Sequence, residues 1–365
     1  MSTKATEILN VIKPRRVIYA ILIGLFTASW MLYRNFDPKV FSTVSWSWSS
    51  TFWIFMAILM MMIRDLGYII RIRILSEGKI KWRDCFDVIM LWEFASAVTP
   101  SVVGGSAVAV FFINKEGINM GRSSAIVLIT ALMDELFFVI MVPLVFLIVG
   151  QMNLFPVALE KNIFGITLNI KGIFWTSYTV ILIYVVTISY ALLFKPRGFK
   201  SFLLRIFKLP FLRRWRVKAL ETGNEIIVAS GEIRKQNAGY WIKAIAATFF
   251  SWTARYWVVN CLILAFVAVD GHFLIYARQL VMWIIMLISP TPGGSGIAEF
   301  AFSGFLKEFS GGLDVPLAVL WRLISYYPYL FIGVIVLPRW LRKVYSRLDR
   351  KEENKSTDDQ SLVNK

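Results

Sequence analysis

The stretch Pro-Thr-Pro-Gly-Gly-Ser-Gly at residues 290–296 interrupts an otherwise apolar run from Phe273 to Leu306. A second apolar run, from Phe86 to Ile113, is interrupted in the same way by Pro-Ser-Val-Val-Gly-Gly at residues 100–105. Proline and glycine favour helix ends, because proline lacks a backbone donor and glycine is conformationally free. Neither half of either run is comfortably long enough to cross about 30 Å of hydrocarbon. Each run therefore predicts a re-entrant pair of half-helices, and a single kinked helix is the alternative.

The rest of the chain has the composition of a membrane protein. Of its 365 residues, 57% are hydrophobic and only 17% are charged, which does not suit a water-soluble surface. The formal net charge is +17, but the lysines and arginines lie between apolar runs and do not form one basic face, so we expect no nucleic-acid binding. Cys85 and Cys261 lie far apart, which predicts two unpaired buried thiols. The single histidine, His272, argues against a His-rich metal site. We expect no metal and no cofactor.

Uninterrupted apolar segments predict about six membrane-spanning helices. The first follows a basic N-terminus, but no small-residue cleavage site comes after it, so we expect an uncleaved helix rather than a signal peptide. The predicted fold is an all-α polytopic membrane protein with about six spanning helices plus two re-entrant broken helix hairpins. The predicted spans are Val17–Tyr33, Thr51–Leu75, Ser123–Val149, Ile173–Phe194, Ile242–Val269 and Val315–Leu337.

The distribution of positive charge predicts the orientation in the membrane. If both broken runs enter and leave on the same side, 31 of the 40 lysines and arginines face the cytoplasm, where such residues are enriched. We therefore expect a multi-pass protein of the cytoplasmic (inner) membrane, with cytoplasmic N- and C-termini. The segments that carry these 31 residues are 1–16, 71–83, 114–122, 195–243 and 339–365.

The same topology contains an inverted repeat. The order helix, helix, broken hairpin, helix starts from the cytoplasm in residues 1–150 and from the outside in residues 151–345. Arg64 lies 40 positions before Gly104, and Arg255 lies 38 before Gly293. Many transporters build alternating access around a central site from such repeats with discontinuous helices.

Two polar regions lie outside the predicted bundle. The basic loop 195–240 interleaves aromatic residues with cations, which predicts a pair of amphipathic helices on anionic lipid; a loop that only directs topology is the alternative. Residues 346–365 are polar and nearly free of large apolar residues from Glu352 onward, so we predict a disordered cytoplasmic tail.

Nine charged residues fall inside apolar segments, where charge is expensive unless it is paired or hydrated. For Asp134, Glu135 and Arg322 we predict a gate between the two halves, because corresponding helices bring charge to similar depth. Ion pairs that lock helices together are the alternative. The full set is Arg64, Asp65, Glu93, Asp134, Glu135, Arg255, Arg278, Glu299 and Arg322.

The second broken run also predicts an anion site. A half-helix that begins just after Gly294 would point free backbone N–H groups and its positive dipole end into the bundle. Gly293 and Gly294 would let a headgroup phosphate approach the backbone, and Arg322 would grip it. Glu299 would lie in the first turns, where it could hold an arginine or a cationic headgroup. A hairpin turn without a binding role is the alternative.

At these residues the sequence resembles the flippase-like transmembrane domain of lysylphosphatidylglycerol synthases and its stand-alone relatives. The likeness covers roughly residues 10–345 and rests on Arg64-Asp65, on Glu93-Phe94-Ala95-Ser96 before Pro100 and Gly104-Gly105, on Pro292 to Glu299, and on Arg322. The sequence departs from the family pattern at Asp134-Glu135, where an acidic residue followed by arginine is common. The candidate substrate-binding residues are Arg64, Glu93, Pro100, Gly104, Gly105, Asp134, Glu135, Arg255, Pro292, Gly293, Gly294, Gly296, Glu299 and Arg322.

The resemblance implies re-entrant helices and translocation of a modified or isoprenoid-linked lipid, without saying which. Separately, we expect membrane lipids, anionic ones first, as partners, with a homo-oligomer as one option. The resemblance does not imply aminoacyl transfer, because a separate soluble domain carries out that reaction in the bifunctional members of the family. The longest hydrophilic stretch here is under 50 residues, whereas a folded domain typically has roughly 100 to 200. We therefore expect a transporter rather than an enzyme. An intramembrane lipid-modifying enzyme and an accessory subunit of a cell-envelope lipid pathway are the alternatives.

Overall fold

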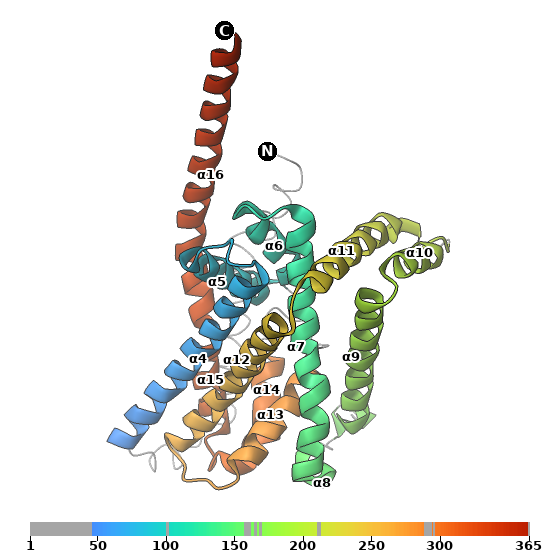
Figure 1. The fold of residues 1–365 in the computed structure, drawn as a ribbon. Coiled ribbons are helices and arrows are strands. Elements are labelled where there is room, and N and C mark those ends of the chain that lie inside the picture. The colour runs from blue at the N-terminus through green and yellow to red at the C-terminus, as the bar shows by residue number, and fades with distance from the viewer. Residues whose placement is uncertain are drawn as a thin grey trace.

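The computed structural model describes residues 46–99, 102–156, 162–163, 166–167, 170–209, 213–287, 294 and 296–363. Within them the chain forms a bundle of helices and one antiparallel pair of two-residue strands, β1 (Asn162–Ile163) and β2 (Ile166–Thr167) (Figure 1). The fold is therefore all-α in character. The predicted span Val17–Tyr33 lies outside the described residues, as do the site residues Pro100, Pro292 and Gly293.

Four segments of the described chain are long and apolar enough to cross a membrane. They are α4 (Trp48–Leu75), α7 (Met120–Val149), α9 (Ile170–Leu193) and the segment Asp314–Val344, which includes α15 (Asp314–Ser325) and the start of α16 (Tyr327–Val363). α12 (Ala238–Leu264) has 27 residues, about 40 Å at 1.5 Å per residue, but is not among these four. These helices carry large apolar side chains on their outer faces, for example Leu147, which is 83% exposed.

The first broken run forms two short helices, α5 (Trp82–Val98) and α6 (Val102–Lys115), that pack against each other. α5 ends where Thr99 takes an extended conformation, as expected for a residue before proline. A Cβ atom on Gly105 would lie 2.1 Å from Ser96 Oγ, so only glycine permits this close approach of the two helices. The run is therefore a helix pair and not one kinked helix.

The second broken run is also divided. α13 (His272–Met286) and α14 (Ile297–Leu306) pack against each other, and a short 3-10 helix, η4 (Lys307–Phe309), leads on toward α15. α14 begins at Ile297, two residues later than the start just after Gly294 that the sequence predicts. The predicted last span, Val315–Leu337, is divided too, because Tyr326 leaves the helical conformation between α15 and α16. Pro328 follows at the second position of α16, where proline suits the start of a helix.

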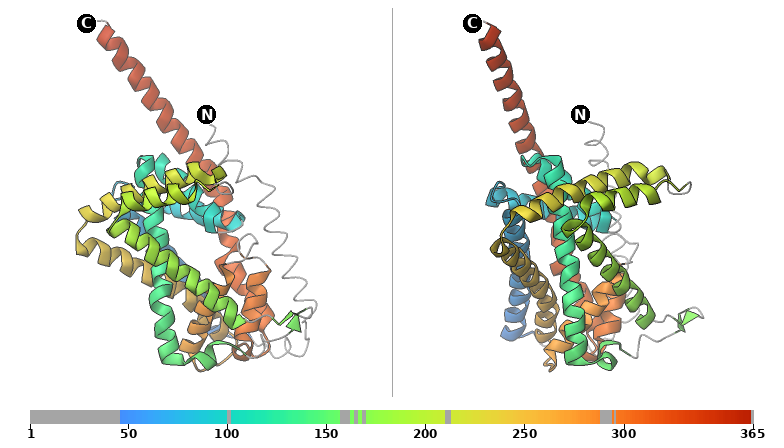
Figure 2. Two further views of the ribbon diagram at one scale, coloured as in Figure 1. Left: turned by 90° about the vertical axis from the view of Figure 1, so that its right-hand side faces the viewer. Right: turned by 45° about the vertical axis from the view of Figure 1, so that its right-hand side comes forward.

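The remaining elements lie at the two ends of the bundle. α10 (Pro196–Ile206) has no buried residues, and it packs with α11 (Arg216–Lys235) into an arm that leaves the bundle beside α9 (Figure 2). The 3-10 helix η2 (Arg213–Trp215) precedes α11, and the short helix α8 (Gln151–Leu154) follows α7. The sequence predicts disorder from Glu352, but α16 continues to Val363. Residues 346–363 of α16 contain no proline or glycine, and they include lysine, arginine and glutamate, which favour helix.

Candidate functional site: a charged cavity inside the bundle

A cavity of about 280 Å³ lies where α4, α7 and α12 meet the inner ends of the two broken runs and the α15–α16 break. Its wall contains four arginines and three carboxylates, together with aromatic side chains. The charged lining residues are Arg64, Arg71, Glu93, Asp134, Glu135, Arg255 and Arg322. Because buried charge inside an apolar bundle is costly, this cluster is the candidate functional site.

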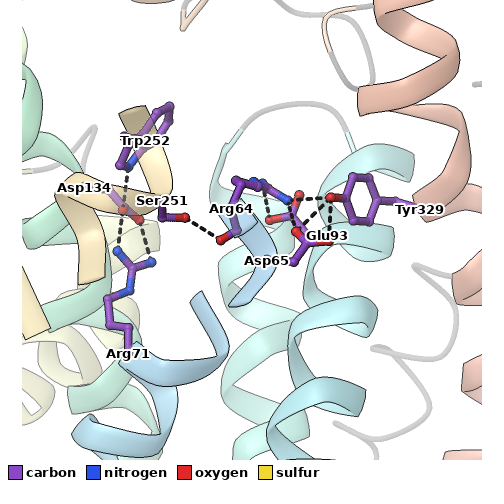
Figure 3. Close-up of polar contacts among 8 residues, drawn as sticks. All are labelled: Arg64, Asp65, Arg71, Glu93, Asp134, Ser251, Trp252 and Tyr329. Carbon is purple, nitrogen blue, oxygen red and sulfur yellow. Dashed lines mark hydrogen bonds and ion pairs between the residues drawn. The ribbon is translucent and has the colours of Figure 1, made fainter. Parts of the chain in front are cut away.

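Arg64 is the most enclosed of these charges, with 1% of its surface exposed. Its guanidinium lies 2.7 Å from Glu93 Oε1 and 2.7 Å from Asp65 Oδ1, and it donates to the Tyr329 hydroxyl at 2.9 Å (Figure 3). The Tyr329 hydroxyl in turn donates to Asp65 at 2.8 Å. These contacts connect α4 with α5 and α16. Arg64 and Glu93, both predicted site residues, are ion-pair partners.

Arg71 lies two turns further along α4 and forms a second group. It pairs with Asp134 through both guanidinium nitrogens, at 2.5 and 3.2 Å, and donates to Thr248 Oγ1 at 3.0 Å. Trp252 Nε1 donates to the same carboxylate at 2.8 Å, so α4, α7 and α12 meet at Asp134 (Figure 3). From the sequence, Arg71 counts both in the predicted span Thr51–Leu75 and among the cations that face the cytoplasm; the structure places it in α4, buried and paired.

Arg322 on α15 lies 3.1 Å from Glu299, the third residue of α14. Glu299 also accepts a hydrogen bond from the backbone N–H of Gly296 at 2.7 Å. The guanidinium of Arg322 lies 3.7 Å from the ring centre of Tyr326. The N-terminus of α14 is thus capped by the chain's own carboxylate. Glu299 holds an arginine, which is one of the two options that the sequence offers for it. The gate between Asp134, Glu135 and Arg322 stays a prediction.

Arg255 on α12 differs from the other three arginines. Its guanidinium lies in a corner between two indoles, 4.2 Å from the ring centre of Trp283 and 5.4 Å from that of Trp252. Within the part of the chain that the structure describes, it forms no salt bridge. Glu135 on α7 lines the same cavity without an ion pair to a described residue, and its Oε2 is buried without a hydrogen-bond partner.

Comparison with known families matches residues 17–333 to the lysylphosphatidylglycerol synthase TM region. The chain belongs to this family. A relative described as a UPF0104 membrane protein, from Archaeoglobus fulgidus, is 27% identical over 300 residues, which cover 78% of this chain and 82% of the relative. No solved structure matches the chain. Membership of the lysylphosphatidylglycerol synthase TM family indicates a membrane protein with a lipid-related role.

The structure brings half of the predicted site residues to one cavity: Arg64, Glu93, Asp134, Glu135, Arg255, Gly294 and Arg322. Glu299 and Gly296 lie beside it through the contact with Arg322 and the start of α14. Gly105 serves helix packing inside the α5–α6 pair, and Gly104 lies in the first turn of α6.

Sequence reasoning missed Tyr68, Arg71, Trp252, Trp283, Tyr326 and Tyr329, all of which line the cavity. A signal was present for some of them. Arg64, Tyr68 and Arg71 are spaced i, i+4, i+7 along α4, so they share one helix face. Thr248, Trp252 and Arg255 repeat this spacing along α12.

Proposed function

We propose that this protein is a flippase-like lipid transporter that moves the polar headgroup of an anionic or headgroup-modified phospholipid, or of an isoprenoid-phosphate lipid, through the central cavity. The observation that carries this proposal is the charged cavity inside an apolar bundle. A volume of about 280 Å³ is near the lower end of ligand pockets, so it suits a headgroup while acyl chains remain in the membrane. The lipid-related role of the family agrees with this reading.

The packing of the helices supports an inverted repeat around that cavity. α4 packs on α5, α5 on α6 and α6 on α7; correspondingly, α12 packs on α13, α13 on α14 and α14 on α15. The leading helices of the two sets, α4 and α12, pack closely against each other and bring Arg64 and Arg255 to the same cavity. Two related halves that meet at a central site can expose that site alternately to the two sides of the membrane.

The proposal is tested by reconstitution of the full chain into liposomes that contain a fluorescent phosphatidylglycerol. A reagent that destroys only the outer-leaflet fluorophore then reports how fast lipid crosses. We expect faster crossing than in protein-free liposomes. An accessory subunit would leave the crossing rate at the protein-free level, and that result would refute the proposed function.

Arg322→Lys is the variant that links transport to the cavity. Lysine keeps the charge but cannot both face Glu299 and lie flat on the Tyr326 ring, since its ammonium is a point charge on a flexible stem. We expect at least a tenfold loss of the crossing rate. Arg342→Lys, an exposed arginine on α16, is the matched control and should retain the wild-type rate.

A further inference from the structure

Arg255 is the cavity arginine whose charge no described carboxylate neutralises. Arg64 faces Glu93 and Asp65, Arg71 faces Asp134, and Arg322 faces Glu299. Arg255 has two indole rings in place of a carboxylate. An arginine held on aromatic faces keeps its guanidinium edge and N–H donors available, because the cation–π contact uses the face of the group.

The two indoles also fix where this arginine points. Trp252 is itself held by its hydrogen bond to Asp134, and its ring centre lies 5.5 Å from that of Trp283 at an interplanar angle of 68°. The two rings therefore form a corner and not a stack. Trp252, Trp283 and Arg255 all line the cavity, so the fixed guanidinium is part of its wall.

We infer that Arg255 is the anion-binding residue of the cavity and holds the phosphate group of the transported headgroup. This rests on the proposed function for the source of the phosphate, but the binding chemistry is separate from it. A guanidinium grips phosphate through two parallel N–H donors, which fits a phosphodiester or a phosphomonoester. The sequence predicts phosphate binding by Arg322 and the start of α14. We assign it to Arg255 instead, because the Glu299 carboxylate already caps the start of α14 and faces Arg322.

Glu135 provides a second test, in which the affinity of the cavity for an anion should change in the opposite direction. Its carboxylate lines the same cavity without an ion pair in the described part of the chain. When ionised it repels an anion in the cavity. Removal of its charge should therefore strengthen the binding of an anion at Arg255, whereas removal of the Arg255 charge should weaken it.

The experiment is calorimetric titration of the purified full chain in neutral detergent with dihexanoyl phosphatidylglycerol, and separately with inorganic phosphate. We expect Arg255→Gln to raise the Kd for the lipid at least tenfold, and Arg255→Lys to raise it at least fivefold. Glu135→Gln should lower it severalfold. Loss of affinity for both probes assigns the site to the phosphate group itself, and loss for the lipid alone assigns it to a lipid headgroup.

Matched controls lie on the same helix. Lys243→Gln removes an exposed cation from α12, and Trp257→Phe changes a tryptophan of α12 that does not line the cavity; both should keep the wild-type Kd. Arg255→Gln should fold, because no described carboxylate loses its partner, and a thermal melt verifies this. An unchanged lipid Kd in folded Arg255→Gln overturns the inference, as does the absence of saturable binding of either probe to the wild-type chain. Lipid binding that depends on Arg255 without any lipid translocation would instead leave the inference standing and refute the proposed function.

Discussion

The pairing of single residues explains why so much charge can lie inside this bundle. The attraction within a buried ion pair offsets the desolvation of its two charges only when the geometry is good and further hydrogen bonds complete it. Asp134 meets this condition, since it accepts from both nitrogens of Arg71 and from Trp252. Arg64 meets it through Glu93, Asp65 and Tyr329. Arg64 and Arg71 are thus held in completed ion pairs, whereas Arg255 faces no carboxylate among the described residues.

This division predicts different costs for two single substitutions. Asp134→Asn leaves the buried Arg71 without its counter-charge, so we expect a loss of roughly 3 kcal/mol in stability and a clearly lower Tm in detergent. The double variant Arg71→Met with Asp134→Leu should regain most of that loss, because an apolar pair of similar volume leaves no charge unpaired. Arg255→Gln should shift the Tm far less than Asp134→Asn. Equal Tm values for the wild type and Asp134→Asn would show that this ion pair is not structural.

Among the helices, α5 is positioned by glycines on two neighbouring helices, α6 and α16. Gly105 of α6 permits contact with Ser96 of α5, and Gly333 of α16 permits contact with Phe94 of α5. A Cβ atom on Gly333 would lie 2.1 Å from Phe94 Cγ, which is far inside van der Waals contact. Because Glu93 lies next to Phe94, the fit of α5 against α16 also sets the place of the Arg64 ion pair.

Two glycine-to-alanine substitutions in helices should therefore change stability in opposite directions. Alanine is favoured over glycine inside a helix by about 1 kcal/mol. At Gly231 of α11 nothing lies within 4 Å of the added Cβ, so this gain should appear as a higher Tm. At Gly333 the clash with Phe94 should outweigh the gain, since overpacking costs about 1 to 3 kcal/mol, and the Tm should fall. Thermal melts of both purified variants measure the difference, and a stabilised Gly333→Ala protein would disprove close packing of α16 on α5.

For the whole molecule, the sequence predicted the parts that follow from local rules. Proline and glycine located both broken runs, hydropathy located α4, α7 and α9, and the expense of buried charge pointed to Arg64, Asp134 and Arg322. Which charge faces which depends on packing between helices far apart in sequence. Arg71 and Asp134 are 63 positions apart, and Arg64 and Tyr329 are 265 apart, so no local pattern identifies either pair. The break at Tyr326 could have been predicted from the sequence, because Pro328 favours the start of a new helix.

The arrangement of the ends of the bundle predicts which loops face the cytoplasm. Figures 1 and 2 place the α4–α5 connection, the α6–α7 connection and the arm of α10 and α11 at one end, with the C-terminal half of α16 beyond it. The start of α4, the helix α8 and the α12–α13 connection lie at the other end. The first end carries most of the lysines and arginines, which are enriched in cytoplasmic loops.

Cysteine labelling tests this orientation in intact cells. Both native cysteines are free and buried, so a background with Cys85→Ala and Cys261→Ala should fold and remain unlabelled. In it, Lys79→Cys and Lys208→Cys should react with a membrane-impermeant maleimide only after the cells are opened, because they lie at the basic end. Asp270→Cys and Gln151→Cys, exposed at the opposite end, should react at once. Reversed labelling of both pairs would invert the orientation, whereas mixed labelling within either pair would show that the two ends do not lie on opposite sides of the membrane, and the inverted repeat would then fail.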